Sequence, residues 1–201
     1  LDVALGGQGA PIVPIGEKYL WPNIPAFLNL GGIANLTIHK QSEYLAYDVC
    51  PANRILNLLA AEAGMTFDDG GQLARRGQLL PGLLNQLNAL DYYQQKPPKS
   101  LSNEFGLYTV WPLIAQEAAS LEDKLRTYVE HIAQQVGEAL HRHPLPTGEL
   151  LLSGGGALNT FLAERLQHHL TPHGLQVRIP HETLVQYKEA LVMALIGVLR
   201  W

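Results

Sequence analysis

Two glycine turns are the parts of this sequence best able to hold a ligand with backbone atoms. Gly31-Gly32 separates two short apolar runs, and three glycines at 154–156 follow the apolar run 150–152. Glycines between strands let the backbone bend tightly and approach a ligand closely. A strand–glycine–helix sequence is typical of anion sites, because helix N-terminal amides are unpaired. Each glycine turn alone could be an ordinary turn without a ligand. Together they predict two backbone binding sites for a nucleotide, one for its phosphates and one for its nucleoside.

These turns differ from two common nucleotide sites. Neither carries the Gly-x-Gly-x-x-Gly pattern of dinucleotide-binding folds, and neither is followed by the Gly-Lys-Ser/Thr of a P-loop. The sequence therefore disfavours both a dinucleotide-binding Rossmann site and a P-loop.

A carboxylate, Asp48, comes at the end of an expected strand and is the candidate for acid–base chemistry. A side chain there can project into a cleft, where a carboxylate can take a proton from water. Pro51 is compatible with the first turn of a following helix. Capping of that helix is the competing role for Asp48, and the residues alone favour the cap. The neighbouring Cys50 has no histidine near it in the sequence, so we expect a buried thiol rather than a nucleophile.

Composition limits the classes of function. The chain has 201 residues, 47% hydrophobic and 16% charged, with a formal net charge of −4. This length supports one domain with a substantial core, and the negative charge offers no basic field for nucleic acid. No apolar run approaches the roughly 20 residues of a membrane span. A single cysteine excludes an internal disulfide framework and fits the reducing cytoplasm. The sequence places no other metal-ligating residues beside the pairs His141/His143 and His168/His169, so no metal ligand is predicted.

The elements that must position these residues alternate in type along the chain. Residues 1–25 are rich in glycine and proline, which predicts an irregular connector or cleft lining, and 91–106 is the longest irregular polar stretch. Early hairpin strands followed by strand–helix units predict an α/β fold with helices on a mixed sheet. The spacing predicts strands at 26–30, 33–39, 44–48, 149–153 and 175–179, a short capped helix within 68–77, and helices at 52–64, 80–90, 109–117, 120–142, 157–170 and 187–200. Helix 120–142 carries an apolar stripe that favours a core role over a dimer seam.

Six blocks of the chain resemble the C-terminal lobe of the anhydro-N-acetylmuramic acid kinase family, from end to end and in family order. They are Asp2–Pro14, Leu28–Leu36, Tyr47-Asp48 with Pro51 and Asn53, Pro97–Ser100, Leu152–Asn159 and Lys188–Leu191. The family belongs to the sugar kinase, actin and heat-shock ATPase superfamily. The resemblance implies a ribonuclease-H-like (actin-like ATPase) lobe over residues 1–201. It also implies that the N-terminal lobe, with its Gly-Thr-Ser-x-Asp-Gly phosphate loop, is absent and that residues 1–25 line the interlobe cleft. The start at Leu1 rather than methionine fits a fragment.

The resemblance also implies a reaction. Family members use ATP, with Mg²⁺, and water to convert 1,6-anhydro-N-acetylmuramic acid to N-acetylmuramic acid 6-phosphate. Water opens the anhydro bridge at C1, and O6 takes the γ-phosphoryl group. Asp48 matches the family's base. By the same resemblance the nucleotide and phosphate contacts are Gly31, Gly32, Asn35, Gly154, Gly155, Gly156 and Asn159, and the sugar contacts are Gln8, Asn53, Lys99, Ser100 and Glu189.

Several of these residues have ordinary structural alternatives. Asn35 is equally compatible with bracing its hairpin, Asn159 with a helix first turn, Glu189 with the solvated start of a helix and Lys99 with a solvated loop. The family's Asp-Thr-Gly-Pro-Gly-Asn is Asp-Val-Cys-Pro-Ala-Asn at 48–53, and its Lys-Ser-Thr-Gly-Arg-Glu is Lys-Ser-Leu-Ser-Asn-Glu at 99–104. These departures motivate an alternative function, an inactive actin-like module that binds nucleotide or sugar. The fragment alone is expected to be inactive, and its partners are a sugar, the missing lobe and, as a further candidate, a second copy in a homodimer.

Overall fold

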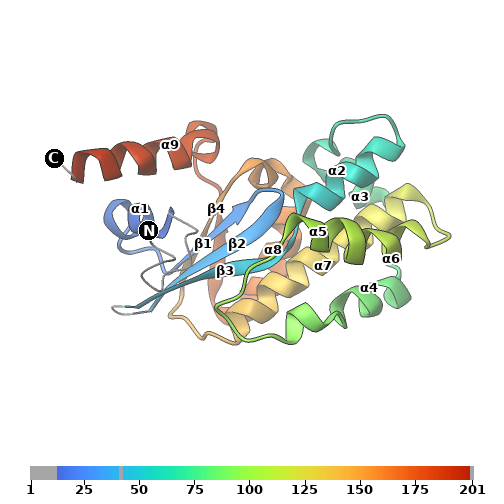
Figure 1. Ribbon diagram of the computed structural model, residues 1–201, viewed down its shortest axis with the longest axis horizontal. Coiled ribbons are helices and arrows are strands. Elements are labelled where there is room, and N and C mark those ends of the chain that lie inside the picture. The colour runs from blue at the N-terminus through green and yellow to red at the C-terminus, as the bar shows by residue number, and fades with distance from the viewer. Residues whose placement is uncertain (1–12, 41–42, 200–201) are drawn as a thin grey trace.

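The computed structural model describes residues 13–40 and 43–199. At its centre is a five-stranded sheet in the order β3-β2-β1-β4-β5 (Figure 1). β2 pairs antiparallel with β1 and β3, whereas β4 pairs parallel with β1 and β5. The predicted mixed sheet, with hairpins first and strand–helix units afterwards, is therefore confirmed. The strands are β1 (Ala26–Leu30), β2 (Ile33–Lys40), β3 (Glu43–Pro51), β4 (Gly148–Ser153) and β5 (Leu175–Arg178).

Helices cover one face of the sheet and enclose the main core. α2 (Asn53–Glu62), α7 (Leu121–His141) and α8 (Thr160–Leu170) share a single buried cluster with the strands. α3 (Gln72–Arg76) and α4 (Pro81–Asn88) pack on α7. α5 (Asn103–Phe105) and α6 (Trp111–Ala115) lie alongside them (Figure 1).

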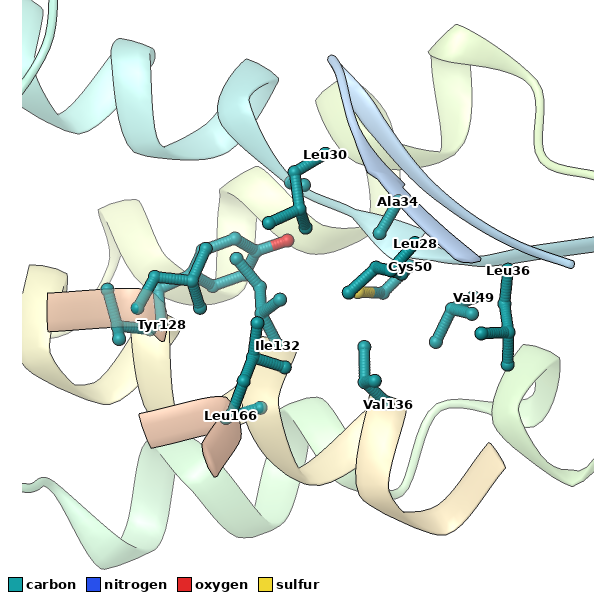
Figure 2. Packing of buried hydrophobic residues seen from close by; sticks show 14 of the residues in the cluster. Leu28, Leu30, Ala34, Leu36, Val49, Cys50, Tyr128, Ile132, Val136 and Leu166 are labelled. Atoms are coloured by element: carbon teal, nitrogen blue, oxygen red, sulfur yellow. The ribbon is translucent and has the colours of Figure 1, made fainter. Parts of the chain in front are cut away.

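Alternation along the strands directs leucines into this core. Leu28 of β1 and Leu36 of β2 point toward Ile132 and Val136 of α7 (Figure 2). All four are fully buried, and burial of one such side chain contributes about 2 kcal/mol. The predicted core role of the long helix is confirmed, because most of α7 is buried. The homodimer stays a prediction.

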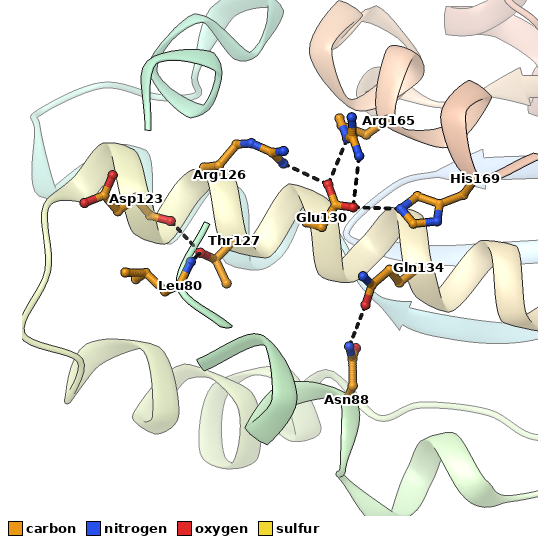
Figure 3. A network of polar contacts seen from close by, with 9 residues as sticks. All are labelled: Leu80, Asn88, Asp123, Arg126, Thr127, Glu130, Gln134, Arg165 and His169. Carbon is orange, nitrogen blue, oxygen red and sulfur yellow. Dashed lines mark hydrogen bonds and ion pairs between the residues drawn. The ribbon is translucent and has the colours of Figure 1, made fainter. Parts of the chain in front are cut away.

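A buried carboxylate ties α7 to α8. Glu130 of α7 accepts hydrogen bonds from Arg126 at 2.8 Å, from Arg165 at 2.8 and 3.1 Å and from His169 at 2.7 Å (Figure 3). Its side chain is 6% exposed. Burial raises the pKa of Glu130, but the hydrogen bonds from these partners outweigh it and hold the pKa well below its usual range.

The opposite face of the sheet carries two further helices, α1 (Val13–Leu20) and α9 (Glu182–Leu199) (Figure 1). They pack against each other at Gly16, where a Cβ would come within 2.2 Å of Val192. Lys188 of α9 lies over the Phe27 ring of β1, with Nζ 4.9 Å from its centre. Among the described residues, no helix is both long and apolar enough to cross a membrane.

Two expectations about helices near the ends of the chain were wrong. Residues 13–20 form α1 instead of an irregular connector; Pro14 is in its first turn, where a missing N–H is tolerated. The last helix begins at Glu182, not at 187, because the amides of Leu184 and Val185 already bond to the carbonyl of His181. The Lys188-Glu189 pair therefore lies within a helix rather than at its start. Residues 1–12, including Gln8, lie outside the described residues.

The segments after β3 also differ from the prediction. β3 runs to Pro51, so this proline ends a strand and does not begin α2. The irregular stretch 91–106 contains a 3₁₀ turn at Asp91–Gln94 and α5. A π-helical turn then joins α5 to α6, so the helical segment expected at 109–117 begins at Asn103.

Candidate active site

A row of polar side chains crosses one face of the sheet, opposite the main core. Asp48 of β3 is paired with Asn35 of β2, which is paired with Asn29 of β1, which is paired with Ser153 of β4. Directly paired residues project from the same face of a sheet, so these four side chains form one row. The row lies close to both glycine turns, since Asn29 and Ser153 come immediately before Leu30-Gly31 and Gly154.

A β-bulge places Asp48 in this row. Asn35 pairs with Asp48, but the preceding residue Ala34 pairs with Cys50, so Val49 is an extra residue in β3. In a regular strand, residues 48 and 50 would point to the same face. The bulge instead leaves Cys50 in the core, fully buried, with Asp48 on the opposite face. Burial raises the pKa of the Cys50 thiol well above its ordinary value, so the expectation of a buried thiol is confirmed.

Both carboxylate oxygens of Asp48 have donors. Asn35 Nδ2 donates to Oδ1, and the amide of Leu101 donates to Oδ2 at 2.7 Å. The backbone of Asp48 is held as well: its N–H donates to the carbonyl of Lys99 at 3.1 Å, and its carbonyl accepts from Tyr92 Oη at 2.6 Å. The N-cap of α2 is Ala52, without a side-chain hydrogen bond. The helix-capping role that the residues alone favoured is therefore wrong.

The turn at Gly31-Gly32 is anchored on the start of α2. The Gly31 carbonyl accepts from Asn53 N at 3.1 Å, and the Gly32 carbonyl accepts from Ala52 N at 2.8 Å. A Cβ on Gly31 would have its nearest neighbour at 3.6 Å, and one on Gly32 at 3.9 Å. Neither glycine has a positive φ. The chain itself could therefore accept alanine at either position.

The second glycine turn is different, because two of its three glycines are required by packing. Gly154 has a φ of +77°, and a Cβ there would lie 2.5 Å from Asn29 Oδ1. A Cβ on Gly156 would lie 2.8 Å from Asn53 Oδ1. Gly155 is exposed, and nothing would approach its Cβ closer than 4.0 Å. The outer two glycines let β4 turn closely against β1, and only Gly155 presents open backbone.

A cavity of about 340 Å³ opens beside this second turn. Gly155, Gly156 and Asn159 line it, as does Asn53. The Asn159 side chain is also the N-cap of α8, since Oδ1 accepts from Leu162 N at 3.0 Å. Asn53 Nδ2 donates to the carbonyl of Leu30 at 2.9 Å, and a Cβ on Gly156 would lie 2.8 Å from Asn53 Oδ1, so Asn53 lies between the two glycine turns.

Sequence reasoning did not assign the loop residues of this cavity, Phe67, Asp68, Asp69 and Gly70, to a site, nor Leu56, Asn57 and Leu158. The sequence predicts a capped short helix within 68–77, which begins with the Asp-Asp-Gly-Gly segment. This prediction is confirmed, because Asp68 accepts from the amides of Leu73 and Ala74 at 2.9 Å. The same loop also presents Phe67, 57% exposed, to the cavity. A lone aromatic residue in a polar, glycine-rich turn was the available signal.

A smaller cavity, of about 190 Å³, lies on the other side of Gly155. Asn29 and Ser153 of the polar row line it together with Lys188 and Glu189 of α9. The structure thus brings the exposed Glu189 to the second glycine turn although it is 33 residues away in sequence. Asn29, Ser153 and Lys188 were not singled out from the sequence.

Lys99 is held on the core side of its loop. Its Nζ donates to the carbonyl of Tyr92 at 2.8 Å and lies 4.2 Å from the centre of the Tyr92 ring. Burial lowers the pKa of Lys99 to about 8. It lines a small cavity with Tyr47 and Arg142, and Asp48 is not part of this cavity. Ser100, its neighbour, is exposed. Lys99 is therefore not the solvated lysine that the sequence allowed.

The fold is that of an actin-like ATPase lobe. Its features are a mixed sheet covered by helices, a hairpin glycine turn after β1 and a second glycine turn after β4. A solved structure titled as an activator of 2-hydroxyisocaproyl-CoA dehydratase from Clostridium difficile with bound ADPNP shares the fold, with a TM-score of 0.59 and 16% identity. The match covers 92% of this chain and 63% of that one.

Sequence comparison identifies the family. The profile of the anhydro-N-acetylmuramic acid kinase family matches residues 1–201. A kinase of that name from Aliivibrio fischeri is 38% identical over 84% of this chain and 48% of its own length, and one from Streptomyces coelicolor is 36% identical over 98% and 52%. The chain belongs to the anhydro-N-acetylmuramic acid kinase family. It spans about half the length of the curated relatives it matches.

Proposed function

We propose that this chain is one lobe of a kinase that uses ATP and water to convert 1,6-anhydro-N-acetylmuramic acid to N-acetylmuramic acid 6-phosphate. One observation carries the proposal. A carboxylate with both oxygens hydrogen-bonded, Asp48, stands in a polar row that reaches both glycine turns. Membership in the kinase family supports the same assignment.

Asp48 acts as the general base. An ionised carboxylate has about four acceptor positions, and Asn35 and Leu101 use one on each oxygen. A water can therefore still donate to Asp48 while the carboxylate stays fixed in orientation. The water loses a proton to Asp48 and attacks C1 of the sugar. The C1–O6 bond breaks, and O6 forms its new bond to the γ-phosphorus as ADP leaves.

The two glycine turns hold the nucleotide. Gly31-Gly32 uses its carbonyls to bind α2, which leaves its open side for the phosphates. The 340 Å³ cavity beside Gly155 takes the nucleoside, and Phe67 and Leu158 provide apolar contacts for the base. Mg²⁺ supplies charge neutralisation on the phosphates. The described residues contain no group of three metal-ligating acids, histidines or cysteines, so oxygens of phosphate and water would supply most of its ligands.

The sugar lies between Asp48 and the cavity lined by Glu189, and a second lobe closes over it. The outer surface of α1 and α9 supports the presence of that lobe. Tyr19 of α1 and Met193 of α9 are more than half exposed, and Ile15, Tyr187, Leu191, Val198 and Leu199 are also exposed. Grouped apolar side chains of this kind mark surfaces that another body covers. A cytoplasmic location belongs to this proposal, and the free thiol at Cys50 and the consumption of ATP support it.

The test is turnover of the anhydro sugar by a protein that contains both lobes. Asp48→Asn is expected to lower kcat about 10²–10⁴-fold, which is the usual contribution of a general base, and to leave ATP binding intact. Asp91→Asn, an exposed carboxylate in the 91–94 turn, is the matched control and should be silent. Full activity of the Asp48→Asn protein would show that Asp48 is not the base. Nucleotide binding without turnover in the unaltered protein would instead support the inactive binding module that the departures at 48–53 suggest.

A further inference from the structure

A chain of buried polar groups runs from α1 and α9 to the polar row of the sheet. Lys188 Nζ donates to Glu17 Oε1 at 2.5 Å and to Ser153 Oγ at 3.3 Å. Ser153 Oγ in turn lies 3.4 Å from Asn29 Oδ1. Glu17, Ser153 and Lys188 are each no more than 3% exposed. Apolar side chains would join two helices at least as well as a buried ion pair, so its position beside Ser153 points to a role beyond packing.

Lys188 fixes the direction of the hydrogen bonds among these buried polar groups. An ammonium group can only donate, so the Ser153 hydroxyl accepts from Lys188 and its single proton goes to Asn29. The amide of Asn29 therefore presents Oδ1 to Ser153 and turns Nδ2 away from it. Nδ2 lies 3.9 Å from the position that a Cβ on Gly31 would occupy. A hydrogen-bond donor is thus aimed at the first glycine turn.

We propose that Lys188 is a positioning residue for phosphate binding, acting through Ser153 to hold the Asn29 amide with Nδ2 toward the phosphates on the Gly31-Gly32 turn. This proposal rests on the proposed function. If Lys188 is removed, the Ser153 hydroxyl can rotate and the Asn29 amide can turn over. An acceptor, Oδ1, then faces the phosphates. Glu17 neutralises the ammonium group, so Lys188 acts through the direction of its hydrogen bond and not through a net positive charge.

The position of these residues supports a ligand-facing role. Asn29, Ser153 and Lys188 all line the 190 Å³ cavity that also borders Gly154 and Gly155. The relay of hydrogen bonds from Lys188 through Ser153 to Asn29 therefore ends at the edge of the nucleotide site. It also links that site to α1 and α9, because Glu17 belongs to the first of these helices and Lys188 to the second.

The experiment compares the binding of ATP, ADP and adenosine by calorimetry to a protein that contains both lobes. Ser153→Ala removes the hydroxyl that links Lys188 to Asn29 and leaves the Lys188–Glu17 pair in place. Lys188→Met removes the donor to Ser153. Both are expected to weaken ATP and ADP binding by about tenfold, the value of one hydrogen bond to a charged group, with adenosine binding unchanged. Ser153→Thr keeps the hydroxyl and should keep the ratio of ATP to adenosine affinity. Lys124→Met, at another buried lysine, 8% exposed and on α7, should also keep that ratio.

Two results would overturn the relay while leaving the nucleotide site in place. One is unchanged ATP affinity in Ser153→Ala. The other is an equal loss of affinity for all three ligands in Ser153→Ala and Lys188→Met, as a purely structural role would give. Failure of the unaltered two-lobed protein to bind any of the three ligands would overturn the proposed nucleotide site and the relay together. Ser153→Ala keeps the test decisive if Lys188→Met does not fold.

Discussion

Replacement of Glu130 by glutamine is expected to be among the most destabilising single-atom changes in this chain. The carboxylate is 6% exposed and accepts from two cationic side chains, Arg126 and Arg165, and from His169. Glutamine keeps the shape but removes the negative charge and turns one acceptor into a donor, which then faces a donor. Breaking a buried ion pair on one side costs about 3–5 kcal/mol. For a domain of this length, 1 kcal/mol corresponds to roughly 2–4 °C, so the melting temperature should fall by about 6–20 °C.

Urea denaturation and thermal melting at pH 7 measure this loss. The matched control is Glu164→Gln, which makes the same chemical change in a carboxylate that binds Arg75 at 2.6 and 2.7 Å but is 55% exposed. Exposed pairs contribute little, so the control should melt with the unaltered chain. Because the pKa of Glu130 is lowered in the folded state, its stabilisation is present above the unfolded pKa of about 4.3 and is lost as the pH falls below it. Equal, small losses in both variants would refute the argument from burial.

Three further predictions follow from the site. Gly154→Ala should cost about 1–3 kcal/mol in urea unfolding, because it strains a positive φ and meets Asn29 Oδ1, whereas Gly155→Ala should leave stability unchanged. The free energy of unfolding of the unaltered chain should rise relative to that of Lys99→Met as the pH increases from about 8 to 10.5. The pKa of Lys99 is lowered in the folded state, so in this pH range the unfolded chain binds more protons than the folded one. A difference that does not change with pH would contradict this. Asn35→Ala should lower kcat without changing ATP affinity if Asn35 braces Asp48, and a loss of ATP affinity at constant kcat would assign it to the phosphates.

The parts of the fold that were predictable are those with a local sequence signal. The five strands and the long helix α7 follow from periodicity, and the two glycine turns from composition. α1 was not predictable, because its stability comes from contacts with α9 across the molecule: Gly16 packs on Val192, and Glu17 pairs with Lys188 over 171 positions of sequence. No window of sequence contains both partners, so proline and glycine content dominated the prediction.

The site shows the same division. Asp48 and the glycines could be named from the sequence, but the surroundings of Asp48 could not. The bulge at Val49 leaves no residue-type signal, and it decides which side chain of β3 faces the polar row. Asn29 and Ser153 could be seen only as part of apolar runs until the register placed them beside Asn35. Their polar character inside such runs was the signal that went unused.

The departures from the family motif spare the contacts of Asp48, and this argues for an enzyme over an inactive module. Val49, Cys50 and Ala52 replace the family's residues after the aspartate, and all three are buried at 3% exposure or less, in the core on the far side of the sheet. In the second altered segment, Leu101 reaches Asp48 through its backbone amide, which any residue except proline would supply. The remaining donor, Asn35, comes from β2, outside both segments. Substitution at these positions can therefore change the packing of β3 while Asp48 keeps both of its hydrogen bonds.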